Sequence, residues 1–265
     1  MDHTKYTLIT GASTGLGKEL ALCCAAAGMH LILTALPGGN MASLAAEIMR
    51  NYPVEVVAYE FDLTDPIALK THTDEIMSRY AINFLINNAG MGGTSSITET
   101  SLERIDRIIL LNVRSTVMLT RLLIPQLLQH EKSYIMNISS MAAFTPIAYK
   151  TVYPASKAFI SSFSLGLREE FSGTGLSVSV VCPGPMMTNS RTSRRIISQG
   201  LKGKMGLLPA ATIAQIALRG TLAQRSLIIP GMMNQVNHLL MRLLPPLMKL
   251  RIVSREVKKE MQYEG

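Results

Sequence analysis

Near its start the chain reads Tyr6-Thr7-Leu8-Ile9-Thr10-Gly11-Ala12-Ser13-Thr14-Gly15-Leu16-Gly17, a short apolar segment that ends in a glycine-rich turn. A helical run, Lys18 to Ala27, follows directly. Glycines let the backbone pass close to a pyrophosphate, and the start of a helix offers it free N–H groups and a positive dipole end. The spacing is G-x-x-x-G-x-G rather than the commoner G-x-G-x-x-G, so a turn that serves packing alone stays an alternative at this point.

The alternation of strand and helix continues along the chain. Apolar runs predict strands at 6–10, 30–35, 54–61, 82–86, 134–138, 176–182 and 227–229. Helical patterns lie between them at 18–27, 42–51, 65–80, 102–130, 153–171 and 209–223, with an interruption near Asn112. Strands that are apolar on both faces require helices on both sides, so the sequence predicts an α/β protein with a parallel sheet.

Candidate functional residues follow five of the predicted strands. They are the glycine turn, Asp62, Asn88, Ser140 and Pro183-Gly184. In an open parallel sheet the ligand crevice lies outside the carboxyl ends of the strands. We therefore expect these residues to gather at one edge.

A second signal is Tyr153-Pro154-Ala155-Ser156-Lys157, thirteen residues after Ser140. A proline suits the first turn of a helix, where Tyr153 and Lys157 would share one face at positions i and i+4. An adjacent cation favours a phenolate and so predicts a lowered tyrosine pKa, which would suit an acid or base. By itself the pattern also describes a solvated surface pair.

Composition narrows the class of protein. The chain has 265 residues, of which 48% are apolar and 17% charged, which suits one well-buried domain without disorder. We see no secretory segment and no run of eighteen uncharged apolar residues, and so expect a cytoplasmic protein. The three cysteines lack metal-ligand spacing, and we expect free thiols and no metal site.

Charge is unevenly spread. Residues 1–188 hold 13 Lys+Arg against 15 Asp+Glu, whereas residues 189–265 hold 13 against 3, a net of +10. No motif for reading nucleic acid accompanies this excess, so we expect no nucleic-acid partner. An anionic substrate carrier, peripheral contact with a membrane surface, and ordinary solvated charge remain as explanations.

These residues together resemble the short-chain dehydrogenase/reductase family over residues 5 to about 230. The likeness rests on Thr10-Gly11-x-x-x-Gly15-x-Gly17, Asp62, Asn87-Asn88-Ala89-Gly90, Asn112, Ser140, Tyr153-x-x-x-Lys157 and Pro183-Gly184. It implies a single-domain Rossmann fold over residues 1–265. The doubly wound sheet would have seven parallel strands in the order 3-2-1-4-5-6-7.

The resemblance also implies catalytic roles. Tyr153 would be the general acid in ketone reduction, and Ser140 rather than Ser139 would hydrogen-bond the carbonyl oxygen. Lys157 would bind the nicotinamide ribose and depress the phenol pKa, and Asn112 would hold a water in the proton relay. Such donors suit the chemistry, because hydride transfer builds negative charge on the carbonyl oxygen.

The coenzyme site follows from the same resemblance. Asp62 and Leu63 would contact the adenine, Asn88 the adenosine side, and Met186 and Thr188 the nicotinamide amide, while Asn87 could instead tie strands together. The full expected set is Gly11, Ser13, Thr14, Gly15, Leu16, Gly17, Asp62, Leu63, Asn88, Ala89, Gly90, Tyr153, Lys157, Pro183, Gly184, Met186 and Thr188.

Coenzyme choice is set at the end of the second strand, where a carboxylate would bond the ribose 2′-OH and an arginine a 2′-phosphate. Here the residues are Ala35 and Leu36. Without an acid a phosphate is not repelled, and the Gly38-Gly39 turn could give it backbone N–H groups. We therefore favour NADP over NAD.

Residues 230–265 are predicted to form a helical extension rich in Met and Leu and interrupted by Pro245-Pro246. It could close over a substrate, pair with a second subunit, lie on a membrane or pack on the domain. Its character is similar to the tails of reductases for 3-oxoacyl, 3-ketosphinganine or steroid ketones.

We expect a hydrophobic carbonyl substrate, bound by residues 90–98, 141–150, a substrate loop at 185–207 and the C-terminal tail. A dimer or tetramer would pair through helices 102–130 and 153–171, as the resemblance implies. The alternative reading is a non-catalytic, nucleotide-sensing regulator on the same fold.

Overall fold

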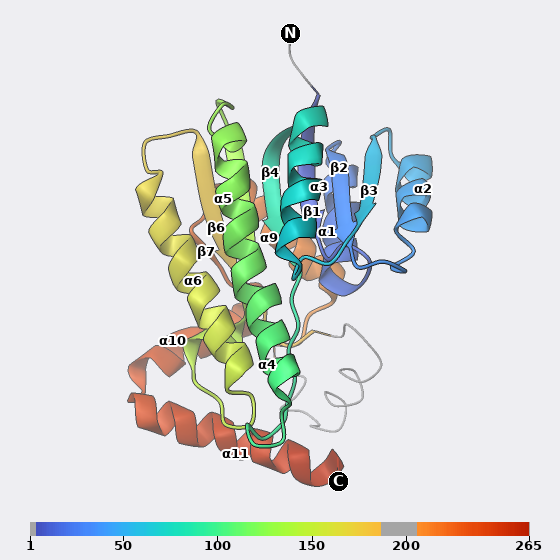
Figure 1. Cartoon of the computed structure of the whole chain (residues 1–265). Coiled ribbons are helices and arrows are strands. Elements are labelled where there is room, and N and C mark those ends of the chain that lie inside the picture. The colour runs from blue at the N-terminus through green and yellow to red at the C-terminus, as the bar shows by residue number, and fades with distance from the viewer. Residues whose placement is uncertain (1–3, 187–205, 265) are drawn as a thin grey trace.

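The computed structural model describes residues 4–186 and 206–264 of the chain. They form a seven-stranded parallel sheet in the order β3-β2-β1-β4-β5-β6-β7, covered by helices on both faces (Figure 1). The strands are β1 (Lys5–Thr10), β2 (His30–Ala35), β3 (Val56–Glu60), β4 (Ala81–Asn87), β5 (Ser133–Ile138), β6 (Leu176–Val181) and β7 (Leu227–Ile228). The predicted fold class and strand order are confirmed.

The helices also fall where the sequence pattern places them. They are α1 (Gly15–Ala26), α2 (Met41–Asn51), α3 (Pro66–Arg79), α4 (Leu102–Ile109), α5 (Ser115–Leu127), α6 (Val152–Glu170), α9 (Ala210–Leu222), α10 (Met232–Leu243) and α11 (Pro246–Glu264). A π-helical turn, η1 (Leu110–Arg114), joins α4 to α5, and a short 3-10 helix, η2 (Met141–Phe144), follows β5. The interruption predicted near Asn112 is this π turn.

Two apolar layers hold the sheet between its helices. Ile9 and Leu33 point toward α1, α2 and α9, whereas Leu8 and Ile32 point toward α3, α5 and α6. Each of these four side chains is essentially inaccessible to water. A fully buried Leu or Ile contributes about 1.5–3 kcal/mol relative to an exposed one, so both layers stabilise the strand ends that carry the site.

The continuous helix Leu102–Leu127, made of α4, η1 and α5, has the length and mean hydropathy (1.5) of a membrane span. Its side chains Leu119, Leu123 and Leu127 are buried against the sheet. We therefore assign it to the core of the domain.

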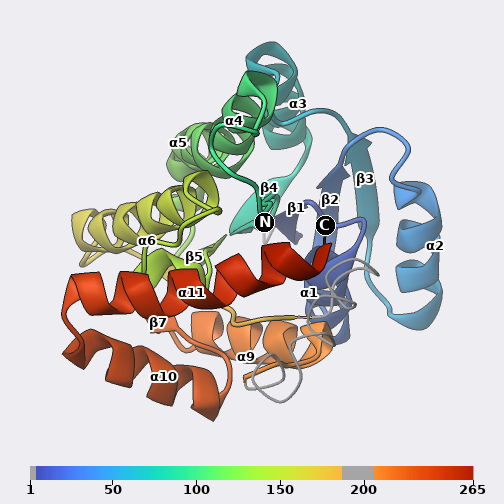
Figure 2. The ribbon, with the colours of Figure 1, turned by 90° about the horizontal axis from the view of Figure 1, so that it is seen from below.

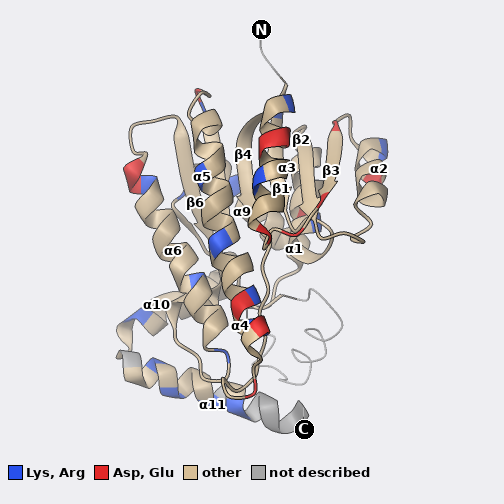
Figure 3. Cartoon of the chain, viewed as in Figure 1, with Lys and Arg blue, Asp and Glu red and all other residues tan. Residues whose placement is uncertain are grey.

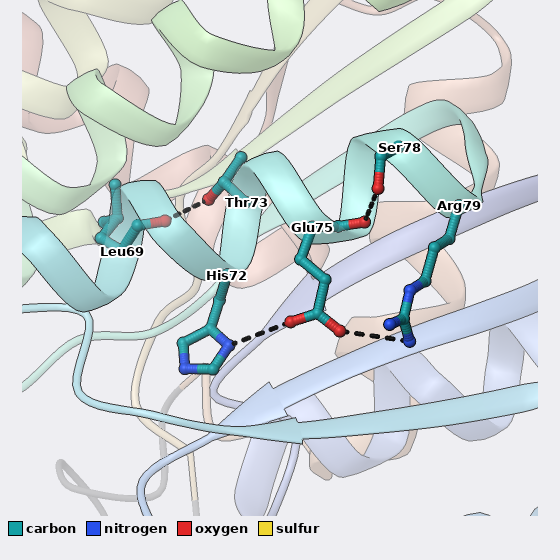
Figure 4. Close-up of polar contacts among 6 residues, drawn as sticks. All are labelled: Leu69, His72, Thr73, Glu75, Ser78 and Arg79. Atoms are coloured by element: carbon teal, nitrogen blue, oxygen red, sulfur yellow. Dashed lines mark hydrogen bonds and ion pairs between the residues drawn. The ribbon is translucent and has the colours of Figure 1, made fainter.

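Helix α3 shows how an outer helix is held by local polar contacts. Asp65 caps its start by accepting hydrogen bonds from two backbone N–H groups, and Pro66 occupies the first helical position. On its exposed side the Glu75 carboxylate lies between His72 and Arg79, at 3.8 and 3.2 Å (Figure 4). Exposed pairs of this kind stabilise a helix by only about 0.3–0.5 kcal/mol, so they set no functional geometry.

The carboxyl ends of the strands all lie at one edge of the sheet, and α10 and α11 lie across that edge (Figures 1 and 2). The predicted helical extension is therefore present, with its break at Pro245-Pro246. Most of the predicted substrate loop, residues 187–205, lies outside the described residues.

Candidate active site

The glycine turn after β1 leaves its backbone open to close approach by a ligand. Gly11 and Gly15 have φ angles of 64° and 56°, in the left-handed region that disfavours side chains. A Cβ added to Gly17 would lie 2.0 Å from the Gly11 carbonyl oxygen, so only glycine fits there. Among the described residues, none gives α1 a side-chain cap or an acid in its first turn. Its N–H groups are thus open to an anion.

Asn88 locks this turn to the end of β4. Its Nδ2 donates to the carbonyl oxygens of Thr10 and Gly11, at 3.0 Å each. In return, the Thr10 hydroxyl accepts from the backbone N–H groups of Asn88 and Ala89, also at 3.0 Å. Asn88 therefore positions the turn, and its contact with the adenosine side of a coenzyme stays a prediction.

Asn87 is structural. Its Nδ2 donates to Asn137 Oδ1 at 2.8 Å and to Thr120 Oγ1 at 3.1 Å, which joins β4 to β5 and α5. This confirms the expectation that it ties strands together.

The two serines that end β5 have different partners. Ser139 is buried and donates to the Lys157 carbonyl oxygen at 2.7 Å. The Ser140 hydroxyl caps η2 by accepting from Ala142 N at 3.1 Å and shares a side-chain hydrogen bond with the Tyr153 phenol. Of the two, Ser140 reaches the tyrosine, as predicted.

Burial raises the pKa of Tyr153 above its ordinary value, and the hydrogen bond from Ser140 only partly offsets this. The sequence predicted the opposite direction, a phenol pKa lowered by Lys157. That prediction is wrong for this structure. The Lys157 ammonium lies 6.0 Å from the centre of the Tyr153 ring. At that distance its attraction for a phenolate is smaller than the cost of removing water from around the phenolate.

Lys157 is fully buried, and burial lowers the pKa of its ammonium to about 8. Its Nζ donates to the carbonyl oxygen of Ile138 at 2.8 Å. A Cβ added to Gly90 would lie 3.2 Å from this Nζ and 3.2 Å from Asn112 Oδ1. Gly90 therefore stands between the two side chains, and the described site brings all three together.

Asn112 sits in the π turn and is nearly inaccessible to water. Its side chain accepts from Met91 N at 2.8 Å and donates to Met91 O and Ser156 Oγ, both at 2.9 Å. It thus pins the loop after β4 to α6. A π turn re-aims one residue of a helix and is frequent at functional sites. The predicted role in holding a water remains a prediction.

Asp62 and Leu63 follow β3, as predicted. The Asp62 carboxylate accepts from the N–H and the hydroxyl of Thr64 at 2.8 Å each, and its other oxygen lies 3.7 Å from Arg107. Leu63 packs in an apolar cluster with Phe61 and is buried. Asp62 is therefore oriented by its neighbours, and only the backbone of Leu63 is free to line a ligand site.

Sequence reasoning missed Asn234, a polar residue near the start of α10. It is buried and donates to the carbonyl oxygens of Pro230 and Gly206, at 2.8 and 2.9 Å. A Cβ on Gly184 would lie 2.6 Å from this side chain, so α10 packs directly on the turn after β6. Its place on the helix is the signal that could have found it, because position 234 falls opposite the apolar positions 232, 236 and 239.

Beyond that turn, the half-buried Met186 pairs with Leu208 in a parallel bridge. Thr188, the other residue predicted for the nicotinamide amide, lies outside the described residues. Cys182 was also missed as a neighbour of the site. It is the buried residue just before Pro183, and burial raises the pKa of its thiol.

Glu60, the last residue of β3, was not singled out from the sequence. It pairs with Ala35 across the sheet, and its exposed carboxylate accepts from Gly38 N at 3.1 Å and from Met41 N at 3.4 Å. Gly39 N donates to Leu36 O at 3.2 Å. The expectation that these two glycine N–H groups are available to a 2′-phosphate is wrong, because each already has an acceptor.

A small hollow of about 20 Å³ opens beside Tyr153, lined by residues from 93–108 and 149–153. It includes parts of two of the three predicted substrate segments, 90–98 and 141–150. A larger hollow, of about 360 Å³, lies at the amino ends of the strands near Lys5 and His30 and holds none of the predicted site residues. The small hollow is therefore the one that bears on the chemistry.

The residues present fit a nicotinamide coenzyme. At Gly11 and Gly17 there is no room for a Cβ, so the backbone of the turn is exposed to a pyrophosphate. The start of α1, which has no side-chain cap, lies next to this turn. From there to Tyr153 the edge is lined by Gly90, Lys157 and Ser140.

Comparison with known proteins agrees with this geometry. A family model described as short chain dehydrogenase matches residues 5–196. A very-long-chain 3-oxoacyl-CoA reductase of Anas platyrhynchos is 32% identical over 182 residues, which are 67% of this chain and 58% of that protein. Several other curated relatives are likewise longer, and the match covers between 31% and 58% of them.

Two solved structures are similar over nearly the whole chain. A short-chain dehydrogenase from Sphingobium yanoikuyae in complex with NADPH is 28% identical, with a TM-score of 0.77 over 91% of this chain and 96% of that one. A bulky-bulky ketone specific alcohol dehydrogenase from Comamonas testosteroni is 27% identical, with a TM-score of 0.76 over 92% and 96%.

Proposed function

The chain belongs to the short-chain dehydrogenase family and is an NAD(P)-dependent oxidoreductase, and from that premise we propose that it reduces a bulky, hydrophobic ketone to a secondary alcohol. The observation that carries the proposal is the hydrogen bond between Ser140 and Tyr153 at the edge that also holds the glycine turn. Both hydroxyls are then within reach of one carbonyl oxygen.

Tyr153 supplies the proton. Because burial raises its pKa, the phenol is protonated at neutral pH and is ready to act as an acid. It gives its proton to the carbonyl oxygen as negative charge develops there. The product is the alcohol, and the tyrosine is left as a phenolate.

Ser140 and Lys157 stabilise the two charges that form. The Ser140 hydroxyl donates a hydrogen bond to the carbonyl oxygen, a contact that strengthens as that oxygen becomes negative. The buried Lys157 ammonium lies 6.0 Å from the tyrosine ring and offsets the charge left on the phenolate. A bound nicotinamide coenzyme supplies the hydride, held at the glycine turn and at Lys157.

The proposed substrate class rests on apolar side chains that follow the carboxyl ends of the strands. Met91, Met141, Phe144 and Met186 follow the strands that end at the edge of the site, and all four are half-buried and offer apolar, adaptable contacts. The names of the similar proteins, a 3-oxoacyl-CoA reductase and a bulky ketone dehydrogenase, support the same class. A long-chain 3-oxoacyl group, a ketosphinganine or a steroid-like ketone fits this description.

For the coenzyme, we propose that Glu60 favours NAD(H), which reverses the preference expected from the end of β2. Its carboxylate takes the Gly38 N–H from the neighbouring strand and places a negative charge where the sequence at Ala35 and Leu36 has none. A 2′-phosphate at this turn would meet like charge, whereas a ribose hydroxyl could donate to the carboxylate.

Replacing Tyr153 by Phe tests the function. We expect Tyr153→Phe to abolish oxidation of the reduced coenzyme across a panel of bulky ketones. The dissociation constant of the coenzyme should stay within about twofold, because the ring keeps its shape and only the proton donor is lost. Retained turnover would refute the role of Tyr153.

A second candidate function is a nucleotide-sensing regulator without catalysis. Such a protein has no need for Asn112, Ser140, Tyr153 and Lys157 together, and all four are held in place by specific hydrogen bonds. Ketone-dependent coenzyme oxidation separates the two functions, since a sensor binds the coenzyme and leaves it unchanged.

We also propose that the protein is cytoplasmic and forms a homo-oligomer. Leu102 and Ile109 on α4, Leu128 just after α5, and Phe159 and Leu165 on α6 are large apolar side chains exposed by 40% or more. An interface between copies would cover such exposed apolar side chains on these helices. Sedimentation velocity measures the state directly.

A further inference from the structure

The apolar face of α10 points away from the protein. Its positions 232, 233, 236, 239, 240 and 243 fall on one side of a helix. All six carry apolar side chains, and the three most exposed are Met232 and Leu243, at 77%, and Leu239, at 61%. The opposite side carries Asn234, which is buried against the turn after β6. A helix that buries an Asn and exposes its Leu and Met residues needs a partner for its outer face.

Helix α11 extends the same surface. Leu247, Met248 and Ile252 are exposed by 69%, 50% and 44%. Its other side is attached to the domain, where Val257 is 4% exposed and Ser254 Oγ accepts from Ala148 N at 3.1 Å. We refer to the outer faces of α10 and α11 together as the tail surface.

The tail surface is positively charged. From Met232 through Arg255 the chain has four Lys or Arg residues and no Asp or Glu, and the last nine residues of α11 add two lysines and three glutamates. Arg242, Arg251 and Arg255 are exposed, and Figure 3 shows the basic residues along α10 and α11. Apolar side chains flanked by cations, with no acids in this stretch, are complementary to a surface in which an anionic layer covers an apolar one.

We propose that the tail surface lies flat on a lipid bilayer that contains anionic headgroups. The Met and Leu side chains of α10 would enter the boundary of the acyl chains, and the arginines would contact the headgroups. A second copy of the chain is the weaker occupant. Pairing the surface with itself would bring the cations of two copies together, and the stretch 232–255 has no acids to neutralise them.

This docking would place the active site at the membrane. The centroids of the His238 ring on α10 and the Phe144 ring lie 4.0 Å apart. On α11, Ser254 Oγ accepts a hydrogen bond from Ala148 N. Both contacts are with the segment that runs from Ser140 to Tyr153. If the proposed ketone reduction is correct, the substrate reaches Tyr153 from the bilayer and is a lipid-soluble ketone.

Co-sedimentation with vesicles tests the proposal on the full-length protein. One set of vesicles is phosphatidylcholine alone, and the other also contains phosphatidylglycerol. We expect binding to the anionic set only, and its loss at about 1 M salt, where the Debye length is about 3 Å. Coenzyme binding, measured without vesicles, reports separately on the proposed function, so either idea can fail while the other stands.

Two double variants separate the apolar and charged contributions. We expect Leu239→Ser/Leu243→Ser and Arg251→Glu/Arg255→Glu each to lower vesicle binding by about tenfold or more, since each cation near an anionic surface contributes about fivefold. Ile67→Ser, at an equally exposed position on α3, and Arg50→Glu on α2 are the matched controls and should bind like the unchanged protein.

Three outcomes would overturn the proposal. They are wild-type protein that stays in the supernatant, equal binding to neutral vesicles, and double variants that bind like their controls. If the wild type fails to bind and Leu239→Ser/Leu243→Ser instead dissociates an oligomer, the tail surface pairs two copies of the chain.

Discussion

The ammonium of Lys157 donates a hydrogen bond to the carbonyl oxygen of Ile138, 2.8 Å away, and this contact fastens the start of α6 to the end of β5. The group is fully buried, and burial lowers its pKa to about 8 from 10.5. Below pH 8 the folded and unfolded chains both carry the proton, and the folded state bears the whole cost of a buried charge. Between pH 8 and 10.5 the unfolded chain binds more protons, so stability rises with pH.

Lys157→Met should therefore stabilise the protein while it removes activity. We expect the free energy of unfolding at pH 7 to rise by about 1–3 kcal/mol, because no charge is left to bury, and the gain to shrink between pH 8 and 10.5. Denaturant unfolding at pH 7, 9 and 10 measures both effects. Lys70→Met, at an exposed position, is the control and should change little. A less stable Lys157→Met at pH 7 would contradict the argument.

Ser139 and Ser140 are adjacent, yet we expect their Ala variants to fail in different ways. Ser140→Ala should lower kcat by about 10²–10³-fold, because the hydroxyl faces the developing oxyanion. Ser139→Ala should keep kcat within a few fold and lower the free energy of unfolding by about 1–2 kcal/mol, since its hydroxyl serves the Lys157 carbonyl. Steady-state kinetics and thermal unfolding of both variants measure these two effects. An equal loss of kcat in both variants would mean that the hydrogen-bond assignment is wrong.

Coenzyme preference should depend on Glu60. We expect the unchanged protein to bind NADH more tightly than NADPH. In Glu60→Gln the ratio of the two dissociation constants should fall by about tenfold, because the like charge beside the 2′-phosphate is gone. The chain has no Trp, so the fluorescence of the bound reduced coenzyme is a clean signal.

Glu169→Gln makes the same charge change at the far end of α6 and should leave the ratio as it is. Tighter binding of NADPH by the unchanged protein, or an unchanged ratio in Glu60→Gln, would show that Glu60 does not set the preference.

Much of the site was predictable because its signals are local. Apolar periodicity placed the seven strands, since each strand must be covered on both faces. Gly11 and Gly15 marked a turn of positive φ, and the interval from Ser140 to Tyr153 identified the correct serine of the two. Strand ends are less sharply encoded, and β3 begins at Val56 rather than at the expected Val54.

The amino-acid sequence by itself determined the sheet, the glycine turn and the tyrosine, serine and lysine of the site, because backbone constraints and burial patterns act over a few neighbouring residues. Only the tertiary structure decided how those groups behave. Desolvation raises the pKa of Tyr153 although a cation lies nearby. The Glu60 carboxylate accepts hydrogen bonds from the segment that follows β2. Asn234 is buried, so the apolar side of α10 faces outward. Each of these depends on what distant segments place around a residue, and that is set only when the chain has packed.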